Sequence, residues 1–200
     1  MPYGMGFTIF RARKPRPKVF GLGLSRTGTT SLNRALRGLG YNVHGYDAAL
    51  LEAWRAGDRD ALFAITDAFD AFEDWPYPLA HAELMDRYGD TARYILTVRS
   101  APATWLASYI AHADRKGTAS ERYRELAYGY PHPRGFEAEH LAFYEAHNRA
   151  VHAAVAERGL QACFAELCWE KGDGWREICA LTGQSVPRAP FPHKNQRSSA

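Results

Sequence analysis

Short apolar runs alternate with helical apolar stripes along this chain. The run VFGLGL at 19–24 is almost continuously apolar, which is typical of a strand buried on both faces of a parallel sheet. A helix is predicted directly after it, over 29–39, because the leucines of this segment fall on one helical face and Gly40 provides a left-handed stop. The first predicted unit is therefore a strand, a tight loop and a helix.

The same alternation continues towards the end of the chain. Further strands are predicted at 41–46, 71–75, 93–98 and 160–167, and helices in segments up to about residue 68, at 79–88, after Pro102, at 141–155 and at 175–181. This order predicts an α/β fold, a three-layer sandwich with a central, mainly parallel five-stranded sheet flanked by helices. Ligands of such folds bind at the carboxyl ends of the strands, here the loops after Leu24, Trp75 and Val98.

Two segments interrupt the alternation. Residues 1–17 hold prolines among basic residues without apolar periodicity, which predicts a flexible basic arm before a single domain at 18–200. Residues 114–134 carry glycines, prolines and many charges, so we expect a long surface connection or lid there. The tyrosines around this segment either line a ligand pocket or form ordinary loop packing; they are Tyr109, Tyr123, Tyr128 and Tyr130.

Composition excludes several classes of function. The net charge of +3 is too small to indicate a nucleic-acid surface, but it suits a pocket for a small anion. Three cysteines without CxxC spacing, and histidines without an i, i+4 pair, predict neither disulfides nor a metal site. No run reaches membrane-spanning length and the start does not resemble a signal peptide, so we expect a soluble, cytoplasmic protein without membrane contact.

The loop between the first predicted strand and helix carries the strongest chemical signal. Gly23 and Gly28 lie five positions apart and a hydroxyl residue follows, as in a Walker A loop, whose backbone amides hold a phosphate at a helix N-terminus. Thr29 stands where nucleotide kinases carry the lysine that reaches the β- and γ-phosphates. A dinucleotide GxGxxG pattern also fails, because its third glycine position is Arg26. The loop therefore predicts an anion site without triphosphate chemistry.

This loop, SRTGTTSL at 25–32, resembles the 5′-phosphate loop of the sulfotransferases that use PAPS (3′-phosphoadenosine 5′-phosphosulfate), a family with a P-loop-type fold. The segment ILTVRSAPATWLASY at 95–109 resembles the 3′-phosphate segment of the same family, with one additional residue before Pro102. The resemblance implies a PAPS-binding site, PAP as product, and no metal. Its nucleotide-binding residues would be Arg26, Thr27, Gly28, Thr29, Thr30, Ser31, Arg99 and Ser108.

A third match, FEDWP at 72–76, resembles the segment in which better-known cytosolic members have a histidine followed by one residue and proline, and Asp74 falls on that histidine. Asp74 is therefore the candidate base that takes the proton of the acceptor, with Glu73 as the fallback, and a helix cap or arginine partner is the structural alternative. Arg26 is the candidate for stabilising charge on the leaving phosphate. Motifs near the end, YEAHN, DGWREIC and PFPHKN, resemble a small bacterial-type branch of the family.

The function predicted from this resemblance is sulfuryl transfer from PAPS to a hydroxyl or amine of a small-molecule acceptor, whose identity the sequence leaves open. Two alternatives stay open: a small-molecule kinase using ATP and magnesium, and a non-catalytic module that binds PAP or PAPS. His147 and Asn148 either face the cleft or form a packing pair. Lys194 and Arg197 either close over the 3′-phosphate or belong to a frayed terminus.

Overall fold

The computed structural model describes residues 16–192, and its centre is one sheet of five short strands. The strands are β1 (Val19–Gly21), β2 (Val43–His44), β3 (Ala71–Phe72), β4 (Arg93–Thr97) and β5 (Phe164–Leu167), in the order β2-β3-β1-β4-β5. Every neighbouring pair is parallel. The predicted α/β fold with a five-stranded sheet is confirmed, and this sheet is parallel throughout.

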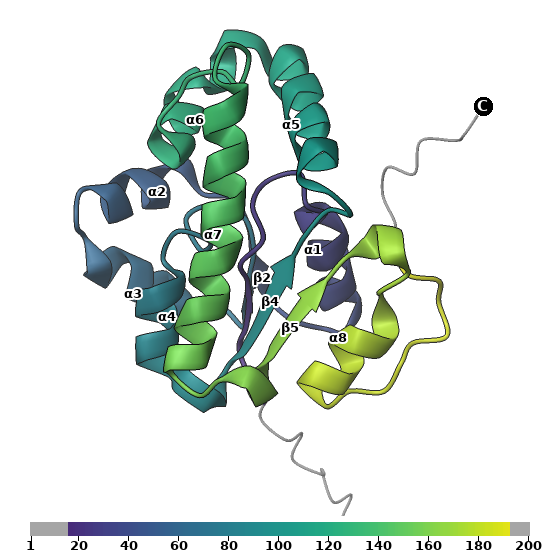
Figure 1. Cartoon of the computed structure of the whole chain (residues 1–200). Coiled ribbons are helices and arrows are strands. Elements are labelled where there is room, and N and C mark those ends of the chain that lie inside the picture. Colours follow the sequence, from purple (N-terminus) through teal and green to yellow (C-terminus); the bar gives the residue numbers. More distant parts are fainter. Residues whose placement is uncertain (1–15, 193–200) are drawn as a thin grey trace, which may run out of the picture.

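Helices cover both faces of the sheet (Figure 1). On one face lie α1 (Thr29–Gly38) and α8 (Trp175–Thr182), and on the other lie α3 (Arg59–Ala68), α4 (His81–Tyr88) and α7 (Glu137–Glu157). Successive strand residues supply the two cores, because side chains alternate across a sheet. Val19 packs in the cluster with residues of α1 and α8, whereas Phe20 packs in the cluster with residues of α4 and α7.

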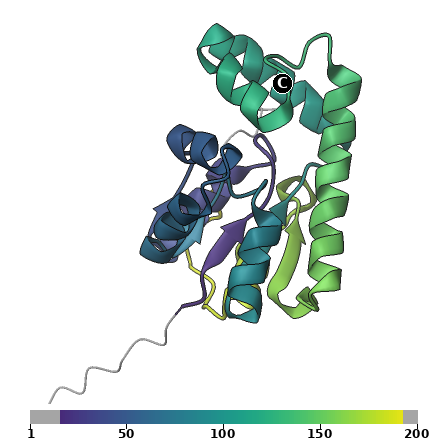
Figure 2. The ribbon, with the colours of Figure 1, turned by 90° about the vertical axis from the view of Figure 1, so that its left-hand side faces the viewer.

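A third group of helices stands above the carboxyl edge of the sheet (Figure 2). It consists of α2 (Ala48–Arg55), α5 (Pro102–Lys116), α6 (Glu121–Tyr128) and the first half of α7, and it encloses a separate aromatic core. Trp105 of α5 is the centre of this core and stacks on Tyr109 and Tyr144, with ring centroids 5.4 and 4.6 Å apart. These helices make one wall above the sheet edge where ligands of α/β folds bind.

The prediction of a long surface connection or lid at 114–134 is wrong for most of this segment. The segment contains the end of α5, a 3-10 turn at Gly117–Ser120 and the whole of α6. Its glycines misled the prediction because they end helices here: Gly117 and Gly129 follow α5 and α6 with positive φ angles of 55° and 86°. The segment is a helical cover.

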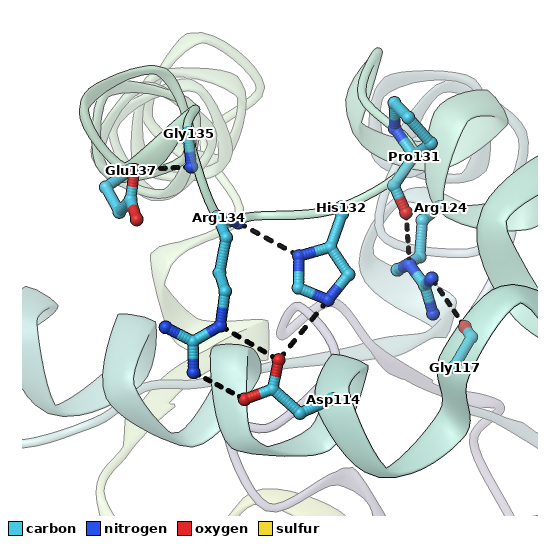
Figure 3. Close-up of polar contacts among 8 residues, drawn as sticks. All are labelled: Asp114, Gly117, Arg124, Pro131, His132, Arg134, Gly135 and Glu137. Atoms are coloured by element: carbon cyan, nitrogen blue, oxygen red, sulfur yellow. Dashed lines mark hydrogen bonds and ion pairs between the residues drawn. The ribbon is translucent and has the colours of Figure 1, made fainter.

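Polar contacts within this cover hold its parts together, and Figure 3 shows them. Arg134 donates to both carboxylate oxygens of Asp114 on α5, at 3.0 and 2.6 Å. The buried Arg124 of α6 donates to the carbonyls of Gly117 and Pro131. The turn before α6 and the loop after it are thereby held together.

The strands are shorter than the apolar runs that predicted them. Leu22 and Leu24 are completely buried, yet they follow β1 in the loop, and Gln161–Cys163 forms a 3-10 turn before β5. The reason is that buried loop residues at the sheet edge are as apolar as the strand residues themselves. An apolar run therefore indicates a buried segment, and only part of that segment pairs with neighbouring strands in the sheet.

Most of the predicted arm at 1–17 lies outside the described residues, as do Lys194 and Arg197. At its described end, Arg16 donates from Nη1 to the carbonyl of Leu39 at 2.7 Å and its guanidinium lies 5.5 Å from the Tyr41 ring. Among residues 16–192, no helix combines the length and apolar character needed to cross a membrane.

Candidate active site

The loop between β1 and α1 lies at the carboxyl edge of the sheet. Gly28 is the N-cap residue of α1, with a positive φ of 105°, and it has no side chain to cap the helix. The first amides of an α-helix have no carbonyl four residues earlier to bond to, and with the helix dipole they attract an anion. Here the Ser31 amide donates to the Gly28 carbonyl at 3.0 Å. The loop has the local geometry of an anion site.

Neighbouring side chains explain why two positions of this loop are glycine. A Cβ on Gly23 would lie 2.0 Å from Oγ1 and 2.5 Å from the carbonyl oxygen of Thr97 in β4. A Cβ on Gly28 would lie 2.2 Å from Nε1 of Trp169. The loop therefore needs these glycines for close packing, and at Gly28 also for its backbone conformation.

Replacing Gly23 by alanine is expected to destabilise the protein by about 3 kcal/mol, because the added methyl group overpacks a site with backbone on its far side. Urea denaturation measures the loss. Gly57→Ala is the matched control: the new Cβ meets nothing within 4 Å, and only the φ of 90° opposes it, at a cost of about 1 kcal/mol. Equal losses in both variants would contradict the packing argument.

Three side chains hold the loop in place. Thr27 is buried, and its hydroxyl contacts the carbonyl of Leu24 at 2.7 Å and the Thr97 hydroxyl at 2.6 Å. Trp105 donates to the carbonyl of Ser25 at 2.9 Å, and Trp169 donates to that of Gly28 at 3.2 Å. Both tryptophan side chains and Thr27 therefore preorganise the loop. The Thr27 amide, one of the predicted phosphate ligands, donates to the Leu24 carbonyl at 3.2 Å.

A cavity of about 1090 Å³ opens above the loop. Its walls come from the loop itself, from the chain after β3, β4 and β5, and from one face of α5. All the site residues predicted from the sequence lie on it: Arg26, Thr27, Gly28, Thr29, Thr30, Ser31, Asp74, Arg99 and Ser108. The structure thus brings together residues that are far apart in the sequence, at the edge where an α/β fold binds its ligand.

Arg26 lies in the loop with a positive φ of 74°, an uncommon conformation for a residue with a side chain. Its Nε donates to Oγ of Ser108 on α5 at 3.3 Å, so the two predicted residues are in contact. Burial, followed by the charges of Arg115 and Arg99, lowers the pKa of Arg26. Three guanidinium groups therefore share the cavity, and an arginine stays charged under these conditions.

Arg99 follows β4 and is held by Glu170, which follows β5. The Nε of Arg99 donates to Oε1 of Glu170 at 2.9 Å, Nη2 donates to the same oxygen, and the Ser100 amide donates to Oε2 at 2.7 Å. Nη1 donates to the carbonyl of Arg26 at 3.3 Å. Although burial opposes it, hydrogen bonding by Arg99 and Ser100 lowers the pKa of Glu170 to about 2. Arg99 is therefore fixed beside the anion loop, with its Nε edge on Glu170.

Asp74 lies in the loop after β3 and also has a positive φ, of 66°. Its Oδ1 accepts a hydrogen bond from the Trp75 amide at 2.9 Å. Burial raises the pKa of Asp74 to about 6, against the opposing effects of that amide and of Arg26. A half-buried carboxylate on the cavity wall, with a pKa near neutrality, has the properties of a general base.

Glu73, the fallback base, does not line the cavity. Its side chain is 6% exposed and accepts a hydrogen bond from Nδ2 of Asn33 on α1 at 2.9 Å. His147 is also turned elsewhere: its Nε2 lies 2.8 Å from the carbonyl of Leu22, which matches the packing alternative. Of the tyrosines named from the sequence, Tyr109 and Tyr128 belong to the buried aromatic core.

Four charged or aromatic cavity residues were missed in the sequence: His112 and Arg115 on α5, and Trp169 and Glu170 after β5. The first two had a readable signal, because they follow Ser108 on the same helical face at i+4 and i+7. His112 lies among cations, and burial together with Arg26 and Arg115 lowers its pKa to about 4. Trp169 and Glu170 had no readable signal in the sequence, because their position at the cavity depends on β5 lying next to β4.

Within residues 16–192, no group of three or more metal-ligating side chains is present. The fold and the cavity define an α/β protein with an arginine-rich cavity at the carboxyl edge of its sheet. Comparisons with known proteins agree: the sulfotransferase domain model matches residues 18–200. Because that match covers most of the chain, the protein belongs to the sulfotransferase domain family and is a sulfotransferase enzyme.

Two individual relatives are similar over most of their length. The Ava biosynthesis cluster protein M of Aspergillus versicolor is 27% identical over 215 residues, which covers 88% of this chain and 80% of that protein. The crystal structure of a sulfotransferase from Alicyclobacillus acidocaldarius aligns with a TM-score of 0.56 and 18% identity, over 92% of this chain and 87% of that one. The second likeness shows the shared fold.

Proposed function

We propose that this enzyme transfers the sulfuryl group of PAPS to a hydroxyl or amine of a small-molecule acceptor. The observation that carries the proposal is the arrangement of cations around an anion loop in which Thr29 replaces the Walker lysine. Arg26 lies in the loop itself, and Arg99, which Glu170 already fixes, contacts the loop from the end of β4. Such a site suits a ligand with two separated anionic groups, as PAPS has.

The described residues fit this donor. The first-turn amides of α1 and Arg26 would hold the 5′-phosphosulfate, and Arg99 with Ser108 would hold the 3′-phosphate. The narrow packing at Gly23 and Gly28 supports the fit, because it fixes the loop backbone before a ligand arrives. The Glu170 carboxylate shares Arg99 and leaves the outer N–H groups of that guanidinium for the phosphate.

The transfer itself is an in-line displacement. The acceptor oxygen or nitrogen forms a bond to sulfur, the bond from sulfur to the 5′-phosphate oxygen breaks, and the electron pair leaves with PAP. Asp74 takes the proton that the acceptor loses, and Arg26 stabilises the charge that develops on the leaving oxygen. Positioning of the two reactants supplies much of the remaining rate enhancement.

The ionised form of Asp74 is the base, so kcat/KM is expected to increase with pH through about 6. Below this pKa the active fraction changes about tenfold per pH unit, and the rate should follow it. A profile from pH 4.5 to 7.5 at saturating PAPS measures the acidic limb. A rate that stays constant across this range would contradict the assignment of Asp74.

The direct test is to incubate the protein with PAPS and a panel of phenols, alcohols, sugars and amines, and to measure PAP formation. We expect release of PAP that depends on one acceptor class. Phosphoryl transfer from ATP and magnesium to the same panel, without any turnover of PAPS, would overturn the proposal in favour of a kinase.

A further inference from the structure

One face of helix α5 forms a wall of the cavity along nearly the whole length of the helix. The residues of α5 that line the cavity recur at spacings of three and four, as residues on one helical face do. They are Thr104, Ala107, Ser108, Ala111, His112 and Arg115. From the first to the last of them the helix rises by about 16 Å. The cavity therefore extends outward from the sheet edge, since α5 leads away from the end of β4 (Figure 1).

The chemistry of this face changes along the helix. Its first four side chains are small, and among them Ser108 accepts a hydrogen bond from Nε of Arg26 at 3.3 Å. His112 and Arg115 follow one and two turns later, and Arg115 lies about 10 Å farther along the helix than Ser108. The anion loop and Ser108 are therefore at the inner end of the cavity, near the sheet, and His112 and Arg115 are at its outer end.

Arg115 differs from Arg99 in that no carboxylate of the described chain holds it. Arg99 donates to Glu170 at 2.9 Å. The acid next to Arg115, Asp114, does not line the cavity and is bound by Arg134. Within residues 16–192, no hydrogen bond or ion pair engages the Arg115 side chain, which is exposed. An unpaired guanidinium group on the wall of a ligand cavity is suited to bind an anionic group of the ligand.

The positive charge at the outer end of the cavity is that of a single guanidinium group. Burial, followed by the charges of Arg26 and Arg115, lowers the pKa of His112 to about 4, so its imidazole is neutral at neutral pH and has one N–H to donate. A carboxylate matches this end of the cavity, because its one negative charge balances one guanidinium group and its two oxygens fit the paired donors of arginine. A phosphate dianion would be only half compensated.

We propose that the acceptor is a small molecule that carries a carboxylate in addition to the hydroxyl or amine that receives the sulfuryl group, and that Arg115 binds this carboxylate. His112 lines the cavity one turn closer to the sheet and offers a second contact to the same ligand. The inference rests on the proposed function and names the class of its acceptor. The two anionic ends of the donor are assigned to the α1 amides with Arg26 and to Arg99 with Ser108, so neither requires Arg115. Arg115 is thus a specificity-determining residue for the acceptor.

The test is calorimetric titration of the full-length protein, saturated with PAP, with small molecules in matched pairs. Each pair consists of a carboxylate and its uncharged amide, which has nearly the same shape. The carboxylates are para-hydroxyphenylacetate for phenols, gamma-hydroxybutyrate for alcohols, glucuronate for sugars and β-alanine for amines. We expect at least one carboxylate to bind roughly tenfold more tightly than its amide, because only the carboxylate makes a charge-assisted contact with Arg115. This preference should decrease at high salt, since Arg115 is exposed.

The variant Arg115→Ala should bind the carboxylate and the amide of that pair with equal affinity, while its affinity for PAP stays unchanged. Arg115→Lys should retain part of the preference, because an ammonium group keeps the charge but not the paired donors. Lys116→Ala is the matched control, since Lys116 is the next residue on α5 and is also exposed, yet it does not line the cavity. It should retain the full preference for the carboxylate.

Three results would overturn this inference while PAP still binds to the wild type. In the first, no carboxylate binds more tightly than its amide. In the second, the preference for the carboxylate persists in Arg115→Ala. In the third, Arg115→Ala loses affinity for PAP, which would assign Arg115 to the donor site. Failure of the wild type to bind PAP would instead overturn the proposed function, and this inference with it.

Discussion

The variant Asp74→Asn is expected to lose about 10² to 10⁴-fold in kcat while it binds PAP with unchanged affinity. The amide has the shape of the carboxylate but cannot take a proton from the acceptor. The change should leave the backbone intact, because asparagine tolerates the positive φ of 66° at this position and can still accept from the Trp75 amide. Steady-state kinetics and PAP titration of the same preparation give the two quantities.

Thermal unfolding provides the control, because the loss of a structural cap would lower the melting temperature. A variant with wild-type kcat and a lower melting temperature would contradict the catalytic assignment and leave Asp74 as a turn residue. The acidic limb of the pH profile gives an independent check, because it should disappear together with the carboxylate.

The variant Arg99→Ala is expected to weaken PAP binding by roughly 100-fold or more, since a charge-assisted contact to a phosphate contributes about 1.5–3 kcal/mol per hydrogen bond. Arg99→Lys should recover only part of the loss, because an ammonium group cannot keep both the Glu170 contact and the Arg26 carbonyl contact of the guanidinium fork. Calorimetric titration with PAP gives the affinity of the wild type and of both variants.

Arg134→Ala is the matched control for this loss. Arg134 also holds a carboxylate with two donors (Figure 3), yet neither Arg134 nor its partner Asp114 lines the cavity. It should retain full PAP affinity. An equal loss in Arg134→Ala and Arg99→Ala would indicate a general effect of removing an arginine and would contradict a specific phosphate contact.

The fold could be predicted because its pattern is local. Strands buried on both faces and helices with one apolar stripe can each be recognised from the pattern of apolar residues. The loop with Gly23 and Gly28 is short enough to be recognised as one motif. The lengths of the strands and the helical cover could not be predicted in this way. Buried loop residues such as Leu22 resemble strand residues, and a glycine that ends a helix resembles one in a loop.

The candidate site was predictable only as far as motifs reach. Arg26, Asp74 and Arg99 each stand within two residues of the end of an apolar run, where a parallel sheet gathers functional residues. Glu170 follows β5, and nothing local indicates that it pairs with Arg99, because this contact depends on the order of strands in the sheet. The contact of Glu73 with Asn33 depends in the same way on how α1 packs beside the end of β3.

The central claim is that the cavity binds the nucleotide of a sulfuryl donor, and one titration tests it most directly. The wild-type protein is titrated with PAP without metal, and separately with ATP and magnesium. The account predicts saturable binding of PAP at one site per chain, and much weaker binding of ATP, because Thr29 replaces the lysine that a triphosphate requires. Binding of ATP and magnesium without binding of PAP would contradict it.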